Sequence, residues 1–142
     1  MIKITRESNR ILIDLQKHDR HLRSGIRKAL HEIGQEVVKE DQRLITEGPK
    51  TGRIYRIKGR DHQASAPGEA PANLSGKLRE SADYKVHSEH KMEVGEYAGY
   101  AGYLETGTSK MEPRPHLIKA VDNNQREALR ALEEYPKEEM GA

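Results

Sequence analysis

The chain has 142 residues, of which 34% are hydrophobic and 34% are charged, with 25 Lys and Arg against 23 Asp and Glu. This length fits one domain with one core, and the absence of cysteine excludes disulfide bonds, thiolate zinc sites and thiol nucleophiles. Because no apolar run is long enough to cross a bilayer and no N-terminal signal core is present, we expect a protein of a cytosol-like compartment, without membrane contact.

The core is thin and the charge is unevenly distributed along the chain. Leu, Ile and Val together make up 26 of 142 residues, which predicts a fold that is stabilised by neighbouring subunits. Residues 1–60 hold 15 basic and 8 acidic residues, whereas residues 61–142 hold 10 and 15. Opposite charge on the two halves favours head-to-tail contacts between copies or one-sided contact with a polyanion. Two solvated helices with a chance excess of charge are an equal alternative.

The N-terminal third predicts a short hairpin followed by a long amphipathic helix. Residues 1–5 alternate apolar and polar, and the apolar run at 11–13 follows a polar turn. From about residue 18 to residue 44 or 45, apolar side chains recur at helical spacing, at Leu22, Ile26, Leu30, Ile33 and Val37. Gly25 and Gly34 inside this helix indicate close packing or a bend.

A long basic loop is expected next. Residues 48–76 contain eight glycines and prolines, so we expect mostly loop, with a possible strand at 54–58 and a protruding segment at 48–65 that becomes ordered on assembly. Five cations lie within eleven residues: Lys50, Arg53, Arg56, Lys58 and Arg60. Such a cluster is typical of contacts to phosphate groups, and with Tyr55 as the single aromatic the contact would be independent of nucleic-acid sequence. A solvated basic loop is the alternative.

The remaining sequence predicts a short helix at 74–81 capped by Asn73, a hairpin of strands at 84–87 and 91–94, and a helical turn with a tyrosine face at 97–105. Pro115 is expected to open a last amphipathic helix that ends near Pro136, leaving 136–142 as a frayed tail. The expected fold class is therefore α+β, with two long amphipathic helices on one face of a small antiparallel sheet.

Candidate catalytic and metal-ligating residues are few. The histidine pairs His18/His21 and His87/His90 have no evident third ligand, so we expect surface histidines, no metal and no cofactor. Glu105 is a possible active-site carboxylate, although a lone glutamate near a helix end is more often solvated or a helix cap. The sequence holds neither a nucleophile elbow nor a phosphate-binding loop. We therefore expect no catalytic residues and no enzyme.

Three segments together resemble a known family. They are 66–81, which contains Pro-Gly-Glu-Ala-Pro and Gly-Lys-Leu-Arg-Glu-Ser; 97–108, which ends in Tyr-Leu-Glu-Thr-Gly-Thr; and 113–120, which reads Pro-Arg-Pro-His-Leu-Ile-Lys-Ala. In this order they resemble the small tail-completion (tail-terminator, neck) proteins of long-tailed bacteriophages, the tail-component family typified by the tenth gene product of a lambdoid coliphage. The resemblance covers about residues 66–122. Its motif residues, expected to be structural, are Pro67, Gly68, Gly76, Leu78, Tyr103, Glu105, Gly107, Thr108, Arg114 and Pro115.

The resemblance implies a structural virion protein rather than an enzyme. Members of such a family form a homo-oligomeric ring, expected here as a hexamer, at the head–tail junction of the virion after assembly in the host cytoplasm. The ring caps the tail tube protein, docks to the head-closure and connector proteins, and lets double-stranded DNA pass. Alternatives are a head-closure or adaptor ring of the same neck, a sequence-independent nucleic-acid-binding module, and a small hydrolase or metal-dependent nuclease.

Two positions differ from the family pattern, and two others carry structural expectations. His116 stands where the family usually has Phe, and Thr106 stands where a bulky residue is common. Both differences remove apolar volume from the expected junction of the last helix and the sheet. We expect Leu104 in the core and Gly107 with a positive φ at a helix exit.

Overall fold

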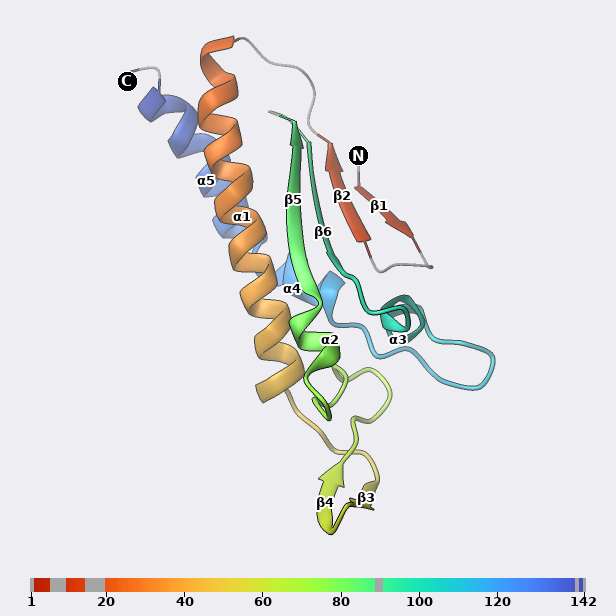
Figure 1. Ribbon diagram of the computed structural model, residues 1–142. Coiled ribbons are helices and arrows are strands. Elements are labelled where there is room, and N and C mark those ends of the chain that lie inside the picture. The colour runs from red at the N-terminus through yellow and green to blue at the C-terminus, as the bar shows by residue number, and fades with distance from the viewer. Residues whose placement is uncertain (1, 6–9, 15–19, 89–90, 140, 142) are drawn as a thin grey trace.

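The computed structural model describes residues 2–5, 10–14, 20–88, 91–139 and 141, and its architecture is α+β, as predicted (Figure 1). The main sheet is antiparallel with the order β1-β2-β6-β5. Its strands are β1 (Ile2–Thr5), β2 (Arg10–Asp14), β5 (Ala82–Ser88) and β6 (Lys91–Glu96). The two hairpins expected from the alternating patterns are confirmed as β1–β2 and β5–β6, and β2 joins them by pairing with β6. The expected turns at 7–9 and 89–90 lie at least partly outside the described residues.

The long helix α1 (Arg20–Glu47) lies against β5 and β6, and α5 (Gln125–Glu139) runs beside its N-terminal half (Figure 1). Ile26, Leu30, Ile33 and Val37 are buried, which confirms the helical stripe read from their spacing. They pack with the inward side chains of β6 and with residues of the C-terminal helices, namely Met92, Val94, Leu117, Ala120 and Ala131. This cluster is the main core.

Two glycines of α1 allow close approach of other elements, as their position inside the helix predicted. A Cβ atom at Gly34 would lie 2.4 Å from the ring of Tyr84 on β5. A Cβ atom at Gly25 would lie 2.4 Å from the Cα atom of Pro136 on α5. Real Cβ atoms do not approach other atoms this closely, so α1 contacts the sheet and α5 through positions without side chains.

The segment 48–65 protrudes at the lower end of the molecule in Figure 1, but it is a hairpin rather than mostly loop. Strand β3 (Ile54–Ile57), which the sequence indicated, pairs with β4 (Arg60–Gln63), which it did not. Lys58 and Gly59 have φ values of 48° and 80° and form the turn. Both strands are largely exposed, so no burial pattern marks β4, and only this two-residue turn signals the hairpin.

The two short helices begin later than the sequence predicted. Helix α2 (Lys77–Glu80) follows Gly76, whose φ is 81°, so Asn73 does not cap it and Leu74 stays exposed. Helix α3 (Ala101–Thr106) begins after Tyr100. Leu78, Ala98 and Ala101 form a second small core with Ile45, against which Leu104 packs while half-buried. Gly107 has the predicted positive φ, 75°.

The predicted last helix is two helices, α4 (Leu117–Asn123) and α5, which begins at Gln125. The break falls at Asn124, whose side-chain amide donates to the Ala120 carbonyl at 2.9 Å and so competes with the backbone. Two further expectations are wrong. Pro115 lies before the helix rather than in it, and α5 continues through Pro136 to Glu139 instead of fraying from residue 136. Pro136 is buried, and its backbone packs on Gly25.

The packing of Gly25 predicts a reversal of the usual effect of a glycine-to-alanine change in a helix. Gly25→Ala gains about 1 kcal/mol of helix propensity but places a methyl group against the Pro136 backbone, where overpacking costs about 1 to 3 kcal/mol. We expect a lower melting temperature than wild type. Exposed Ser24, the neighbouring position of α1, is the matched control: Ser24→Ala is neutral or stabilising. Stabilisation by Gly25→Ala would contradict this packing.

Candidate functional site

The three segments that carry the family resemblance meet in one corner of the molecule. The backbone N–H of Gly68 donates to the Pro113 carbonyl at 3.0 Å. The Arg114 guanidinium donates to the Ser65 hydroxyl at 2.8 Å and to the Ser65 carbonyl at 3.2 Å. The backbone N–H of Arg114 donates to the Leu104 carbonyl at 2.7 Å. Segments 66–81, 97–108 and 113–120 are thus joined by hydrogen bonds that use their motif residues.

Glu105 is the cap of helix α4. It is buried at the end of α3, and its carboxylate accepts from three consecutive backbone N–H groups: those of His116 at 3.0 Å, Leu117 at 3.1 Å and Ile118 at 3.0 Å. A helix start leaves its first N–H groups without intrahelical partners and carries partial positive charge, so a carboxylate is well placed there. Of the two structural expectations for Glu105, these contacts are those of a helix cap, and the buried side chain is not the solvated group.

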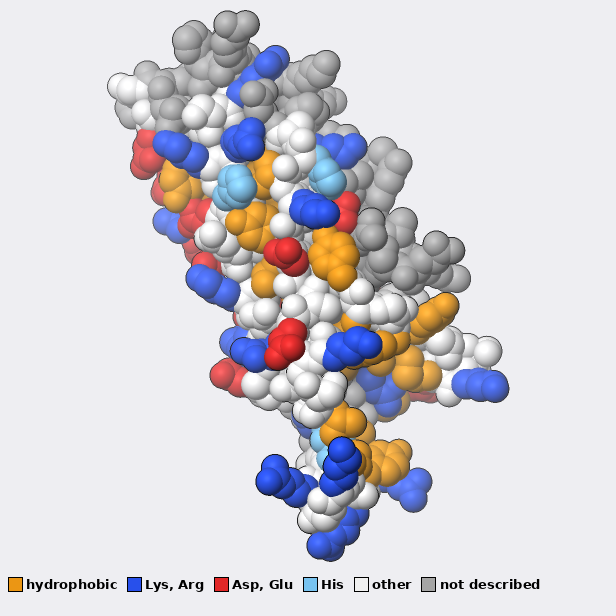
Figure 2. All heavy atoms as spheres, in the orientation of Figure 1, with side chains coloured by type: hydrophobic (Ala, Val, Ile, Leu, Met, Phe, Trp, Pro, Cys, Tyr) orange, Lys and Arg blue, Asp and Glu red, His pale blue; other side chains and the backbone are white. Residues whose placement is uncertain are grey.

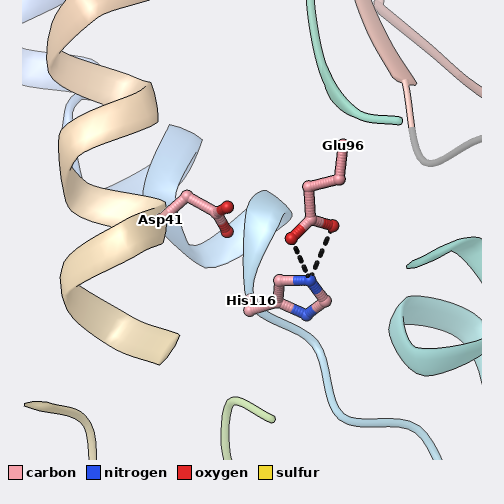
Figure 3. Close-up of side chains that lie close together, drawn as sticks. All are labelled: Asp41, Glu96 and His116. Atoms are coloured by element: carbon pink, nitrogen blue, oxygen red, sulfur yellow. Dashed lines mark hydrogen bonds and ion pairs between the residues drawn. The ribbon is translucent and has the colours of Figure 1, made fainter. Parts of the chain in front are cut away.

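His116 is fully buried and contacts both Glu105 and Glu96, which lies at the end of β6; Figure 3 shows the His116–Glu96 contact. Its Nε2 atom lies 2.7 and 2.8 Å from the two carboxylate oxygens of Glu96. Its Nδ1 atom lies 2.8 Å from the Arg114 carbonyl and 3.0 Å from a Glu105 oxygen. Where the family pattern has Phe, this chain therefore places an imidazole with polar partners at both nitrogens.

Asp41 of α1 completes the cluster, and its carboxyl group points toward Glu96 and His116 in Figure 3. The side chain is 0% exposed, and neither of its oxygens has a hydrogen-bond partner among the described residues. Ligand atoms of Asp41, Glu96 and His116 all lie within 4.8 Å of one another. We call these three residues, with Glu105, the buried polar cluster.

The cluster shifts the pKa values of its members. Burial, helped by the neighbouring negative charge of Glu96, raises the pKa of Asp41 to about 8. Burial alone would lower the pKa of His116, but the hydrogen bond to Glu96 and the charges of Glu96, Glu105 and Asp41 outweigh it and raise that pKa to about 9. The cluster therefore favours the charged form of the His116 imidazole and the uncharged form of the Asp41 carboxyl group.

The basic hairpin carries four of the five predicted phosphate-contacting cations. Arg53, Arg56, Lys58 and Arg60 are exposed on β3–β4 and its edges, and Figure 2 shows Lys and Arg side chains surrounding this projection. The Arg53 guanidinium lies 5.4 Å from the centre of the Tyr55 ring. Lys50 lies apart from them: it is half-buried and donates to the Leu44 carbonyl near the end of α1, and burial lowers its pKa.

The root of the hairpin is fixed by Glu69. Its carboxylate accepts from the Thr51 hydroxyl, from the Thr51 backbone N–H at 2.9 Å and from the Ala66 backbone N–H at 2.8 Å. These hydrogen bonds, that of the Thr51 hydroxyl first, lower the pKa of Glu69 to about 2. The hairpin therefore leaves the body of the protein from a defined anchor.

Four large side chains near the motif segments are exposed, and two of them, Leu74 and Tyr100, line a groove that reaches the hairpin. Tyr97, Tyr100 and Tyr103, the predicted tyrosine face, are 40%, 40% and 54% exposed, and Leu74 is 62% exposed. The groove has a volume of about 360 Å³ and is lined by residues of the motif segments and of β4, including His62, Leu74, Tyr100 and Arg114. In Figure 2, hydrophobic side chains gather around the α3 end of the molecule. We call Leu74, Tyr97, Tyr100 and Tyr103 the tyrosine surface.

The residues considered for catalysis do not come together in the described part of the chain. His87 is exposed on β5, 3.2 Å from Glu93 of β6, whereas Glu105 is buried beside His116. His18, His90 and the side chain of His21 lie outside the described residues. None of the described helices is long and apolar enough to span a membrane.

Sequence reasoning missed Asp41 and Glu96, although each carries a signal. Asp41 lies four residues after Val37 in the apolar stripe of α1, and Glu96 continues the inward alternation of Met92 and Val94 in β6. With His116 in place of Phe, three polar residues occupy positions where the pattern calls for apolar ones. Such coincident exceptions indicate a shared buried site.

Comparisons with known proteins give no relative. No family model matches the sequence, and neither the curated proteins nor the solved structures include a significant match. The site must therefore be interpreted from its own geometry.

The cap of α4 predicts a large cost for truncating Glu105. Glu105→Ala leaves three N–H groups without their acceptor, and we expect a loss of about 2 to 4 kcal/mol in the free energy of unfolding. Glu105→Gln keeps one acceptor oxygen and should lose less. Glu112→Ala, an exposed change in the same connection, is the control. Equal stability of Glu105→Ala and Glu112→Ala in denaturant titrations would contradict the capping role.

The anchor of the hairpin predicts a pH dependence. Because the pKa of Glu69 is lowered, its carboxylate stabilises the folded protein fully at pH values above the ordinary pKa of 4.5. This stabilisation is lost as the pH falls toward 2. A carboxyl-carbon NMR titration should place its midpoint well below 4. Thr51→Val removes the hydroxyl donor and should move the midpoint upward. A midpoint near 4.5 in the wild-type protein would show that these hydrogen bonds do not form.

Proposed function

We propose that this chain is a structural subunit of a bacteriophage neck that forms a homo-oligomeric ring of about six copies. In this role it caps the tail tube, contacts the head-closure complex and lets double-stranded DNA pass. The observation that carries the proposal is the use of the resembling segments: Gly68, Glu105, Gly107 and Arg114 serve to build one corner of the fold. These roles are those expected of motif residues that maintain the fold rather than carry out a reaction.

The surfaces around that corner support a role in assembly. The tyrosine surface and the exposed Ile54, Tyr55 and Ile57 of the basic hairpin leave large apolar side chains in water at one end of the molecule. Aromatic side chains with a polar tip are typical of protein interfaces. The hairpin adds positive charge to this end, which suits contact with an acidic neighbour or with DNA in a channel. In a tail-proximal ring or in a head-closure adaptor ring, these surfaces would contact neighbouring subunits and DNA in the same way.

A sequence-independent nucleic-acid-binding module is the second candidate, because of the hairpin. It presents Arg53 over Tyr55 with Arg56, Lys58 and Arg60 nearby, a combination that contacts phosphates and stacks on bases. In this case the isolated subunit binds DNA, and the affinity falls steeply with salt. In the neck proposal, assembly into a ring comes first and does not require DNA.

Assembly of the purified chain distinguishes the two candidates. We expect native mass spectrometry and electron microscopy to show closed rings. We also expect Tyr100→Ser with Tyr103→Ser to dissociate them without changing the melting temperature of the subunit, since both side chains are exposed. Arg126→Ala on α5 is the control and should leave the rings intact. A chain that stays monomeric at all concentrations, and binds DNA in a way that alanine at Arg53, Arg56, Lys58 and Arg60 abolishes, would contradict the neck proposal.

A further inference from the structure

Three members of the buried polar cluster bring together ligand atoms from three separate parts of the fold. Asp41 comes from the C-terminal third of α1, Glu96 from the end of β6 and His116 from the residue before α4 (Figure 3). All three side chains are 0% exposed. Their carboxylate oxygens and imidazole nitrogen lie within 4.8 Å of one another, a span that contains the separations found around a single bound cation.

The burial of the Asp41 carboxylate is not explained by the hydrogen bonds of the described residues. Its two oxygens are buried, aimed at the other two side chains, and without a partner among the described residues. A buried polar group without a partner is costly, and in native proteins such a group indicates a role or an absent ligand. A proton on the carboxyl group would remove its charge and let one oxygen donate to Glu96, but the other oxygen would still be buried without a partner.

We propose that Asp41, Glu96 and His116 bind one divalent transition-metal ion, with Zn²⁺ as the best-fitting candidate. The donor set is one imidazole nitrogen and two carboxylates, whose two negative charges balance a dication when the imidazole is neutral. A nitrogen donor favours Zn²⁺, Mn²⁺ or Co²⁺ over Mg²⁺ and Ca²⁺, which prefer oxygen ligands.

The surroundings of His116 fit this role. Its Nδ1 atom lies 2.8 Å from the Arg114 carbonyl, so an N–H at this position is held by the backbone. Metal-binding histidines commonly use one ring nitrogen in this way, which fixes the ring and leaves the other nitrogen for the ion. Here the other nitrogen, Nε2, faces Glu96 at 2.7 Å. A metal ion would replace the proton shared between these two groups.

The ion would be structural. Because the three ligands are closed to solvent, the site links α1, β6 and α4 rather than presenting the ion to a substrate. In a chain whose core is thin, a link between three elements at the corner of the motif segments adds stability where apolar contacts are few. This inference stands independently of the proposed neck function.

The test is refolding with and without the metal, because the site is closed in the folded protein. The full chain is unfolded in denaturant and refolded in EDTA or in excess Zn²⁺. At about one hundred times the dissociation constant, we expect the wild-type melting temperature to rise by about 5 to 10 °C. One Zn²⁺ per chain should remain after gel filtration. Asp41→Asn keeps the shape of the side chain and should lose both effects.

A matched variant and a spectroscopic measurement complete the test. Glu93→Gln alters the His87–Glu93 pair, which lies outside the cluster, and should keep the full Zn²⁺ effect. Refolding with paramagnetic Co²⁺ should broaden NMR signals around Asp41, Glu96 and His116, a result that requires no variant. The proposal is overturned if the wild-type protein retains no metal, if Asp41→Asn shows the same stabilisation, or if the broadening is centred on His87.

Discussion

The Glu105 carboxylate accepts hydrogen bonds from three backbone N–H groups at the start of α4. The corner where the three motif segments meet depends on this interaction. Helix α4 has only seven residues, so the N–H groups of its first turn, which have no partner within the helix, are a large share of its backbone donors. The carboxylate that meets this demand comes from the end of α3, and it also fixes His116 at the point where α1 and β6 converge. A buried glutamate thus couples two short helices to the main core, where apolar residues are few.

This arrangement explains why motif residues that suggest chemistry serve architecture here. Glu105 and Arg114 are the kinds of side chain found in active sites, yet the first caps a helix and the second holds Ser65 beside the root of the hairpin. The surfaces left exposed by this corner are the tyrosine surface and the basic hairpin. A fold that fixes its corner by buried polar groups and leaves aromatic and basic groups outside is suited to contacts with other chains, as the proposed ring requires.

The sequence predicted the elements whose pattern reflects burial, such as the stripe of α1 and the alternation of β5 and β6. It did not predict β4, because an exposed strand needs no apolar alternation, and it joined α4 to α5, because the break depends on how the Asn124 side chain turns back to Ala120. The sequence did not predict that α5 continues through Pro136, because the Pro136 backbone packs against Gly25 and only the tertiary structure shows this contact. Of the buried polar cluster, Glu105 and His116 were singled out from the motifs. Asp41 and Glu96 became meaningful only once three elements were seen to meet.

The most direct measurement of the central interaction is hydrogen exchange at the backbone amides of His116, Leu117 and Ile118. If the Glu105 carboxylate accepts all three, these amides exchange only through global unfolding, with protection equal to that of the core of α1. First-turn amides without an acceptor exchange rapidly even in a folded protein. Rapid exchange at these three positions in an otherwise protected chain would contradict the account.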